Sequence, residues 1–284
     1  MSPTTTPPVA LTIGGSDSGA GAGIQADLKA MSALGVFAAT AITAVTAQNS
    51  TAVVEVHPVP LRTVDAQIGA VLEDLPVASV KTGMLGSAET VGLVAGRAAA
   101  GELPRLVVDP VMVASTGRPL LDAAGIAAYR DLLLPHALLV TPNLWEAAIL
   151  AEREPPGAFD LDGMVSLARA IHRLGPRWVL VKGGHLPGVH GPAPGPGTGQ
   201  VCDVLFDGRE LSVLEEPRIA TRNNHGTGCT LSAATAARLA SGSGVPQAVA
   251  EARRFVQRAL AGSAGWELGR GHGPLDPFGW APPR

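Results

Sequence analysis

The sequence predicts an α/β fold in three layers, with helices on both faces of a mostly parallel central sheet. Two observations lead to this fold class. Short runs rich in Val, Ile, Leu and Ala alternate along the chain with longer segments of helical periodicity. The short runs are almost continuously apolar, which is typical of parallel strands covered on both faces. Strand–helix alternation of this kind favours right-handed crossovers and a sheet buried between two helical layers.

Each expected strand is a short apolar run that ends in turn-forming residues. Strands are expected at residues 9–15, 37–49, 77–85, 105–113, 137–143 and 177–185. A glycine-rich turn follows the first strand and opens a helix with Ile24, Leu28, Met31 and Leu34 on one face. Further helices are expected near residues 87–100, 122–134, 144–151, 162–174, 229–240 and 246–263.

Residues 201–219 predict a hairpin, because Asp207-Gly208 is a favoured two-residue turn between two apolar runs. No internal repeat or shift in composition marks a boundary, so one domain is expected over residues 1–284. Residues 186–200 are rich in Gly and Pro and are expected to form a flexible surface loop. An irregular tail is expected at residues 270–284.

The bulk composition excludes several classes of protein. The 284 residues are 46% hydrophobic but only 4% aromatic, so a core of Ala, Val, Leu and Ile is expected. The net charge of −3 and the lack of a basic stripe argue against nucleic acid as the main partner. The longest apolar runs fall short of the roughly 20 residues that a membrane-spanning helix needs. The N-terminal residues lack the basic start of a signal peptide, so a cytoplasmic protein is expected.

Cysteine and histidine usage argues against a zinc site. Cys202 and Cys229 are the only cysteines, and neither belongs to a C-x-x-C motif. Since nothing indicates export, both are expected to be free thiols in a reducing cytosol. The seven histidines show no metal-ligand spacing. His185 and His225 lie beside glycine turns, where they could line a site.

Glycines and polar residues gather directly after the expected strands. In sheets of this kind, ligands bind at the carboxyl ends of the strands. There the sequence has "GGSDSGAGAG", "TAQN", "GML", "DPVM", "TPNLWE" and "VKGGH". No P-loop motif occurs, and "GSDSGAGAG" departs from the dinucleotide fingerprint because Ile24 follows it. The repeated pattern predicts one site at this edge of the sheet.

The turn "HGTGC" at residues 225–229 leads into an alanine-rich helix. Unpaired amides at a helix start attract anions, and Gly226 and Gly228 would let an anion approach them closely. The alternative is a plain loop-to-helix junction in which Cys229 is a small buried hydrophobe. We favour the anion site because both glycines lie within three residues before the cysteine.

Charged and polar residues after three other strands fit the same interpretation. Asp109, Asn143 and Glu146 could hold Mg²⁺ through its waters, since Mg²⁺ uses few protein ligands. Equally, Asp109 could cap a turn and Glu146 could simply favour a helix start. Lys182 ends an apolar strand and needs a partner there, which a phosphate would provide.

Two further residues offer less specific chemistry. The Gln48 carboxamide can donate and accept at once, which suits a ring nitrogen beside an amino group. A polar turn after the strand is the simpler interpretation of Gln48 and its neighbour Asn49. Met84 could flank a flat ring, although filling the core is the default role of a methionine.

Taken together, the motifs resemble a known family. "TIGGSDSGAGAGIQADLKAMSALGV", "ITAVTAQN", "KTGML", "DPVM", "TPNLWEA", "VKGGH" and "HGTGCTLSAA" occur in this order across about residues 11–235. The combination closely resembles the hydroxymethylpyrimidine and hydroxymethylpyrimidine-phosphate kinases of thiamine biosynthesis, which are ribokinase-like enzymes. The resemblance implies ATP-dependent phosphorylation of 4-amino-5-hydroxymethyl-2-methylpyrimidine, and then of its monophosphate to the pyrophosphate.

The resemblance also implies how the pyrimidine is bound. Gln48 would bind the aminopyrimidine, and Met84 and Val111 would pack against its ring. The rest of the pocket would be lined by Asp27, Gly15 and Ala22.

The same resemblance implies a phosphate side of the site, and a homodimer. Gly226, Gly228 and the Cys229 amide would form the anion hole for the transferring phosphate. The nucleotide would be contacted by Lys182, Thr227 and Asn143, and Mg²⁺ would be supported by Asp109, Asn143 and Glu146.

Cys229 carries the most specific mechanistic expectation. Many ribokinase-like sugar kinases have an aspartate at this position, so the cysteine separates this chain from them. We expect Cys229 to act as a base toward the acceptor, with a thiol pKa lowered by the helix start to about 3.5–7.5.

Three alternatives remain open at the level of sequence. A pyridoxal kinase of the cysteine type shares several of these motifs. A thiol hydrolase would use Cys229 as a nucleophile, but it needs an oriented base that the sequence does not show. A pyrimidine sensor would bind the ring without consuming ATP.

Overall fold

The computed structural model describes residues 6–113, 119–154, 161–184 and 199–280. Its strands are β1 (Val9–Asp17), β2 (Phe37–Gln48), β3 (Val53–Pro58), β4 (Val77–Thr82), β5 (Val107–Val108), β6 (Leu139–Val140), β7 (Trp178–Lys182), β8 (Gln200–Phe206) and β9 (Leu211–Pro217). Its helices are α1 (Gly23–Ala33), α2 (Leu61–Asp74), α3 (Ala88–Ala99), α4 (Ala123–Ala128), α5 (Leu144–Leu150), α6 (Leu161–His172), α7 (Thr227–Ala240) and α8 (Val245–Ser263).

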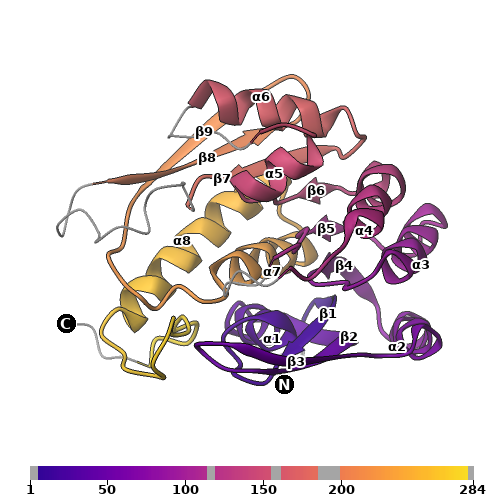
Figure 1. Ribbon diagram of the computed structural model, residues 1–284, viewed down its shortest axis with the longest axis horizontal. Helices are drawn as coiled ribbons and strands as arrows, with labels where there is room; N and C mark the ends of the chain where they lie inside the picture. Colours follow the sequence, from indigo (N-terminus) through magenta and orange to yellow (C-terminus); the bar gives the residue numbers. More distant parts are fainter. Residues whose placement is uncertain (1–5, 114–118, 155–160, 185–198, 281–284) are drawn as a thin grey trace, which may run out of the picture.

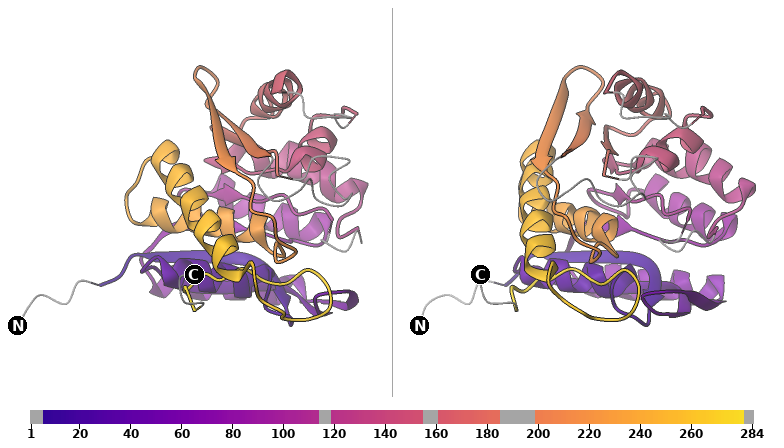
Figure 2. Two further views of the ribbon diagram at one scale, coloured as in Figure 1. Left: turned by 90° about the vertical axis from the view of Figure 1, so that its left-hand side faces the viewer. Right: turned by 60° about the vertical axis from the view of Figure 1, so that its left-hand side comes forward.

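The strands form one nine-stranded sheet in the order β3-β2-β1-β4-β5-β6-β7-β8-β9. Six strands run parallel, namely β1, β2, β4, β5, β6 and β7. The pairs β2–β3, β7–β8 and β8–β9 are antiparallel. Helices lie on both faces of the sheet (Figure 1 and Figure 2). The predicted three-layer α/β fold is confirmed.

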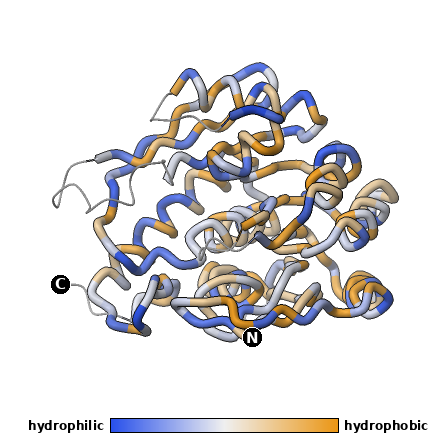
Figure 3. The backbone as a smooth tube through the Cα atoms, viewed as in Figure 1, coloured by the Kyte–Doolittle hydropathy of each residue, from blue (hydrophilic) through white to orange (hydrophobic). Residues whose placement is uncertain are grey.

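The sheet separates two apolar cores. One face is covered by α1, α7 and α8, which contribute buried side chains such as Met31 and Phe255. The other face is covered by the helices from α2 to α6, which contribute side chains such as Ile68 and Val94. Figure 3 shows hydrophobic residues along the central strands between these layers. Within the described residues, no helix is both long and apolar enough to cross a membrane.

Helix α7 lies close to the sheet because small residues form its inward side. Ala233, Ala236 and Ala237 are fully buried there. The hydroxyl of Ser79 in β4 donates a 2.7 Å hydrogen bond to the carbonyl oxygen of Ala236. Alanine and serine side chains let the helix backbone approach the strands, so the first turn of α7 reaches the carboxyl edge of the sheet.

The expected elements are present, with ends that differ from the prediction. The strands expected at 105–113 and 137–143 are reduced to the two-residue strands β5 and β6. The helix expected at 122–134 divides into α4, a π-helical turn η1 (Tyr129–Leu133) and a 3₁₀ turn η2 (Leu134–His136).

Two elements, β3 and α2, were not predicted. Strand β3 is short and exposed, and prolines close to its end obscure its pattern. Helix α2 buries only Val64 and Ile68, so its apolar face is too narrow to be recognised as a helical pattern in the sequence.

The predicted hairpin is confirmed and is tied to the rest of the protein by a buried ion pair. Asp207 accepts hydrogen bonds from the amides of Arg209 and Glu210 in its turn. Farther along β8, Asp203 Oδ2 lies 2.9 Å from Nε of Arg253 in α8. The other oxygen of Asp203 accepts the Gly183 amide at 2.9 Å. One carboxylate therefore joins α8, the hairpin and the end of β7.

The expected loop at 186–200 lies almost entirely outside the described residues. Residues 270–280 of the expected tail contain no helix or strand beyond an isolated bridge between Pro274 and His225. This segment is nevertheless fixed in place. The amides of Gly271 and His272 donate to the side chain and the carbonyl of Ser50. A Cβ at Gly271 would collide with that carbonyl, so only glycine permits the contact.

Arg253→Met is expected to lower the free energy of unfolding by about 3–5 kcal/mol, because it leaves the Asp203 carboxylate buried without its ion-pair partner. Urea unfolding followed by circular dichroism measures the loss. Arg254→Met is the matched control, since Arg254 is exposed on the same helix. Equal losses in the two variants would contradict a stabilising role for this ion pair.

Candidate active site

A cavity of about 920 Å³ opens at the carboxyl edge of the parallel strands. The ends of β1, β2, β4 and β7 contribute residues to it, as does the first turn of α7. Every residue predicted for the site lines this one cavity, namely Gly15, Ala22, Asp27, Gln48, Met84, Asp109, Val111, Asn143, Glu146, Lys182, Gly226, Thr227, Gly228 and Cys229. The structure therefore brings these predicted residues together in one place.

The turn before α7 depends on its glycines. Gly226 precedes the helix with φ 81°, a left-handed conformation that suits glycine. A Cβ at this position would also collide with the carbonyl oxygen of Gly21. No side chain of the described residues caps α7, which leaves its first amides available to a ligand.

Lys182 lies against this helix start. A Cβ at Gly228 would sit 3.1 Å from Lys182 Nζ, so the glycine leaves room beside the ammonium group. Lys182 Nζ is 3.0 Å from Asp109 Oδ1. Asp109 also accepts hydrogen bonds from the hydroxyls of Thr141 and Ser232. Burial opposes the charge of Asp109, but Lys182 and Lys81 outweigh it and lower the pKa of the carboxyl.

Asn143 and Glu146 form a capping box at the start of α5. The Asn143 side chain accepts from the Glu146 amide at 2.9 Å, and the Glu146 carboxylate accepts from the Asn143 amide at 2.8 Å. The helix-start role considered for Glu146 is therefore real, although both residues also line the cavity. Burial raises the pKa of Glu146 to about 7; Lys182 acts against this shift and Asp109 adds to it.

The carboxylates fit a magnesium ion that is held mainly by water and phosphate. Across the described ranges, no group of three or more His, Cys, Asp and Glu side chains is arranged to hold a metal ion. Asp109 and Glu146 supply two buried carboxylates beside the cavity. Mg²⁺ usually keeps several waters and takes only one or two protein carboxylates, so this donor set suits it.

A buried ion pair beneath the cavity was missed by sequence analysis. Lys81 Nζ lies 2.8 Å from Asp27 Oδ2, and both side chains are almost fully buried. The Thr12 hydroxyl donates to the same oxygen at 2.6 Å. Asp27 Oδ1 is also buried and has no hydrogen-bond partner among the described residues. Lys81 lies near the end of a mostly apolar strand, as Lys182 does, so its position in the sequence could have identified it as a site residue.

The expected lowering of the Cys229 pKa is wrong. Burial raises the pKa of this thiol to about 11, although the charge of Lys81 and the Gly23 amide act in the opposite direction. Removing the thiol from water penalises the thiolate more than these groups and the helix start favour it. Cys229 is thus a neutral thiol near pH 7.

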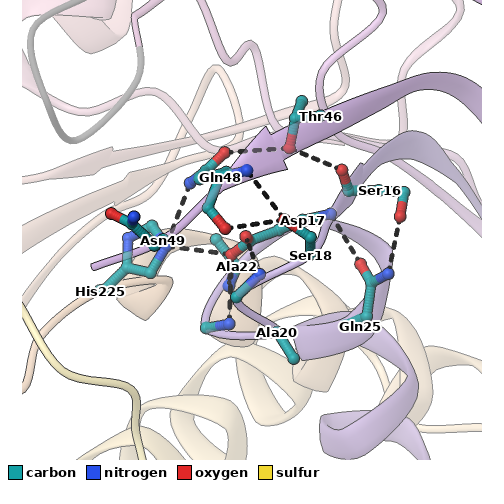
Figure 4. A network of polar contacts seen from close by, with 12 residues as sticks. Ser16, Asp17, Ser18, Ala20, Ala22, Gln25, Thr46, Gln48, Asn49 and His225 are labelled. Carbon is teal, nitrogen blue, oxygen red and sulfur yellow. Dashed lines mark hydrogen bonds and ion pairs between the residues drawn. The ribbon is translucent and has the colours of Figure 1, made fainter. Parts of the chain in front are cut away.

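A polar network joins the glycine-rich loop after β1 to the turn before α7 (Figure 4). Asp17 accepts hydrogen bonds from the amides of Gly19, Gly21 and Ala22. His225 Nε2 lies 3.1 Å from Asp17 Oδ2 and 3.3 Å from Nε2 of Gln48. Burial opposes the charge of Asp17, but the bonds from His225 and the loop amides lower its pKa.

Sequence analysis missed Asp17, although its position between a strand and a glycine-rich turn was available as a signal. His225 does line the cavity, as considered. His185 lies outside the described residues.

Another wall of the cavity is apolar. A Cβ at Gly15 would collide with the terminal methyl group of Met84, so the glycine makes room for this side chain. The Thr43 hydroxyl donates to the Met84 carbonyl at 2.6 Å and fixes its backbone. Val111 and Ala22 also line the cavity.

A second end of the cavity lies between the β8–β9 hairpin and α8. Sequence analysis selected none of its residues, because their order in the chain does not place them near the strand ends. Its apolar lining is formed by Val201, Ile219, Val256 and Leu260. Its polar lining includes Arg218, Thr221 and Gln257.

Comparison with known proteins extends the resemblance over most of the chain. A family described as "Phosphomethylpyrimidine kinase" matches residues 17–276. The hydroxymethylpyrimidine/phosphomethylpyrimidine kinase of Rhizobium meliloti is 48% identical, over 95% of this chain and 97% of its own. The thiamine biosynthetic bifunctional enzyme TH1, chloroplastic, of Arabidopsis thaliana is 46% identical, over 95% of this chain and 50% of its own.

A solved structure agrees with the fold. The pyridoxal kinase from Staphylococcus aureus, in complex with AMP-PCP and pyridoxal, superposes with a TM-score of 0.83 at 32% identity. The superposition covers 97% of this chain and 95% of that one. The ribokinase-like fold implied by the motifs is thereby confirmed. From the family match and the identity of its relatives, the chain belongs to the phosphomethylpyrimidine kinase family.

Proposed function

We propose that this kinase transfers a phosphoryl group from ATP to 4-amino-5-hydroxymethyl-2-methylpyrimidine, and then a second one to the monophosphate, in thiamine biosynthesis. One observation carries the proposal: a single cavity is lined both by the carboxamide of Gln48 and by the glycine-rich start of α7 beside Lys182. Membership of the phosphomethylpyrimidine kinase family supports it.

The pyrimidine would bind between Gln48 and the apolar wall of Met84 and Val111. The carboxamide of Gln48 can pair with an amino group and a ring nitrogen at once. Asp27 Oδ1, which is buried without a hydrogen-bond partner among the described residues, would accept a further donor from the substrate. Such an acceptor is costly to leave unpaired, so a ligand donor is favoured there.

The transferring phosphoryl group would lie over the first turn of α7. Phosphoryl transfer has a loose transition state, so positioning and charge neutralisation contribute most of the acceleration. The backbone amides of Gly226, Gly228 and Cys229 would donate hydrogen bonds to the phosphate oxygens. Lys182 would contact the phosphates of ATP, and Thr227 and Asn143 would stand beside the nucleotide.

The adenine of ATP would occupy the end of the cavity between the hairpin and α8. Val201, Ile219, Val256 and Leu260 provide an apolar slot of the kind that a purine ring enters. Asp109 and Glu146 would hold Mg²⁺ through water. When bound, the ion supplies neutralisation of the charge that the phosphates carry.

We also propose that Cys229 takes the hydroxyl proton of the first acceptor. The pKa of the Cys229 thiol is about 11, which is four units above pH 7. At pH 7, about one protein molecule in 10⁴ therefore carries Cys229 as a thiolate. A thiolate with so high a pKa is a strong base, and the rare ionised form would accept the proton of an alcohol readily.

A pyridoxal kinase is the second candidate. The Staphylococcus aureus pyridoxal kinase covers 97% of this chain at a TM-score of 0.83, so the two substrates could be held on one scaffold. A coupled ADP-release assay with the hydroxymethylpyrimidine, its phosphate and pyridoxal separates the candidates. We expect turnover with both pyrimidines; turnover with pyridoxal alone would overturn the proposal. Pyrimidine-dependent ATP consumption would reject a thiol hydrolase or a non-catalytic sensor.

For the assembly, we propose a homodimer of single kinase domains spanning residues 1–284, in the cytoplasm. The resemblance to the family supports the dimer, and the two free cysteines suit a reducing compartment. Light scattering would give twice the chain mass of 28.8 kDa.

Cys229→Ala is expected to slow the first phosphorylation by a factor of about 10²–10⁴, while nucleotide binding stays close to that of the wild type. The second transfer should lose less, because its acceptor phosphate is already ionised. The wild-type rate of the first transfer should rise with pH between 7 and 10, and the variant's rate should not. Single-turnover rates for both steps measure this. Equal losses in both steps, or parallel pH profiles, would rule out the base assignment.

Glu146→Gln is expected to raise the Mg²⁺ concentration needed for half-maximal activity and to alter how stability depends on pH. Without metal, the folded-state pKa of Glu146 is about 7, above its ordinary value of 4.5. The stability that this carboxyl contributes is therefore present below pH 4.5 and is lost as the pH rises through about 7. The variant should gain stability over the wild type on going from pH 5 to pH 8.

Thermal unfolding of the metal-free proteins at both pH values tests this prediction. The glutamine can still accept the Asn143 amide, so the capping box is retained. Glu73→Gln is the control, because Glu73 is exposed on α2. If the Tm of Glu146→Gln differs from that of the wild type by the same amount at pH 5 and at pH 8, the raised pKa of Glu146 is contradicted.

A further inference from the structure

The carboxamide of Gln48 lies between two neighbours that both limit how it can be oriented (Figure 4). Its Nε2 is 3.3 Å from His225 Nε2. Its Oε1 is 3.3 Å from the hydroxyl oxygen of Thr46. The same His225 nitrogen is 3.1 Å from Asp17 Oδ2. A single imidazole nitrogen either donates one proton or accepts one, so it cannot accept from Gln48 and donate to Asp17 at the same time.

Asp17 decides where the proton of His225 is. Its carboxylate already accepts from the amides of Gly19, Gly21 and Ala22, which holds it in one place. An ionised carboxylate can only accept hydrogen bonds. His225 Nε2 therefore carries a proton and donates it to Asp17, because an unprotonated nitrogen at 3.1 Å would set two lone pairs against each other.

The imidazole is held in this position from two further sides. A Cβ at Gly21 would collide with Cδ2 of His225, so the ring packs directly on the glycine. The backbone amide of His225 donates to the Gly273 carbonyl at 3.0 Å. The side chain is itself buried. The single Nε2–H of His225 lies between Asp17 and Gln48, so both can share it as a bifurcated donor, and Nε2 has no lone pair to offer Gln48.

At the other end of the carboxamide, Thr46 needs a hydrogen-bond donor from Gln48. Its hydroxyl has one proton, and it makes contacts of 2.8 Å to the Ser16 carbonyl and 3.3 Å to Gln48. The shorter contact takes the proton, since a carbonyl oxygen at 2.8 Å is a near-ideal acceptor. Toward Gln48, Thr46 then offers only lone pairs.

A half-turn of the carboxamide satisfies both neighbours. With Nε2 toward His225, donor faces donor and acceptor faces acceptor. Rotation about the Cγ–Cδ bond exchanges the two atoms without moving the rest of Gln48. The oxygen then accepts the longer branch of the His225 N–H hydrogen bond, whose shorter branch goes to Asp17, and the amide nitrogen donates to Thr46.

We propose that Asp17 and His225 are positioning residues that hold the Gln48 carboxamide with its oxygen toward His225 and its nitrogen toward Thr46, and so determine which pyrimidines are accepted. The proposal rests on the function proposed above, in which Gln48 binds the ring. An aminopyrimidine offers an amino donor beside a ring-nitrogen acceptor. The fixed carboxamide receives the amino group on the His225 side and the ring nitrogen on the Thr46 side.

A 4-oxo pyrimidine exchanges this donor and acceptor, because it carries a carbonyl at position 4 and a proton on the adjacent nitrogen. A carboxamide locked by its neighbours cannot turn to match it. The oxo analogue is therefore rejected, since sites built to hydrogen-bond one pattern discriminate strongly against the other. A carboxamide free to turn would accept both.

The test compares kcat/KM for the 4-amino substrate and its 4-oxo analogue. The wild type should prefer the amino compound by about 10²-fold or more. His225→Phe keeps a planar ring but has no N–H, and its preference should fall at least tenfold with the KM for ATP unchanged. His225→Gln restores a donor and should recover most of the preference. His57→Phe, on exposed β3, is the matched control.

Each outcome decides a separate question. If His225→Phe loses kcat/KM equally for the amino and the oxo pyrimidine, its preference is unchanged. That result would overturn the proposal and would leave His225 with a purely structural role. Failure of the wild type to phosphorylate the aminopyrimidine would instead overturn the proposed function. If His225→Phe does not fold, Thr46→Val removes the acceptor on the other side. Its preference should also fall, and an unchanged preference would overturn the proposal.

Discussion

The whole site depends on how closely the first turn of α7 approaches the carboxyl edge of the sheet. Two constraints permit this approach. Alanines and Ser79 let the helix backbone lie against the strands. Gly226 and Gly228 remove side chains that would meet the Gly21 carbonyl and the Lys182 ammonium group. A side chain at Gly226 would push the helix start away from the Gly21 carbonyl, and a side chain at Gly228 would displace the Lys182 ammonium group, so both glycines of "GTG" follow from geometry.

Buried charges around this contact are arranged in ion pairs. Lys182 is neutralised by Asp109, and Lys81 is neutralised by Asp27. Each pair reduces the cost of burying an isolated charge. Both lysines are therefore buried beside a carboxylate of opposite charge.

Much of the site could be predicted because parallel strands place their carboxyl ends along one edge. Gln48, Asp109 and Lys182 each follow an apolar run, so their proximity follows from topology. The second end of the cavity could not be predicted, because Val201 and Val256 come together only through packing of the hairpin on α8. The pKa of Cys229 was also beyond the sequence, since it depends on burial rather than on the helix start that the motif reveals.

Two contacts that complete the cavity wall around Gln48 join residues that are far apart in the sequence. Gly271 bonds to Ser50 across 221 positions, and Asp17 meets His225 across 208 positions. Contacts between such distant positions form late, because closing so long a loop costs entropy before any contact compensates. During synthesis, the first strands can pair before His225, which contacts Gln48, has been added to the chain. A nascent chain is thus expected to have a sheet well before it can select a substrate.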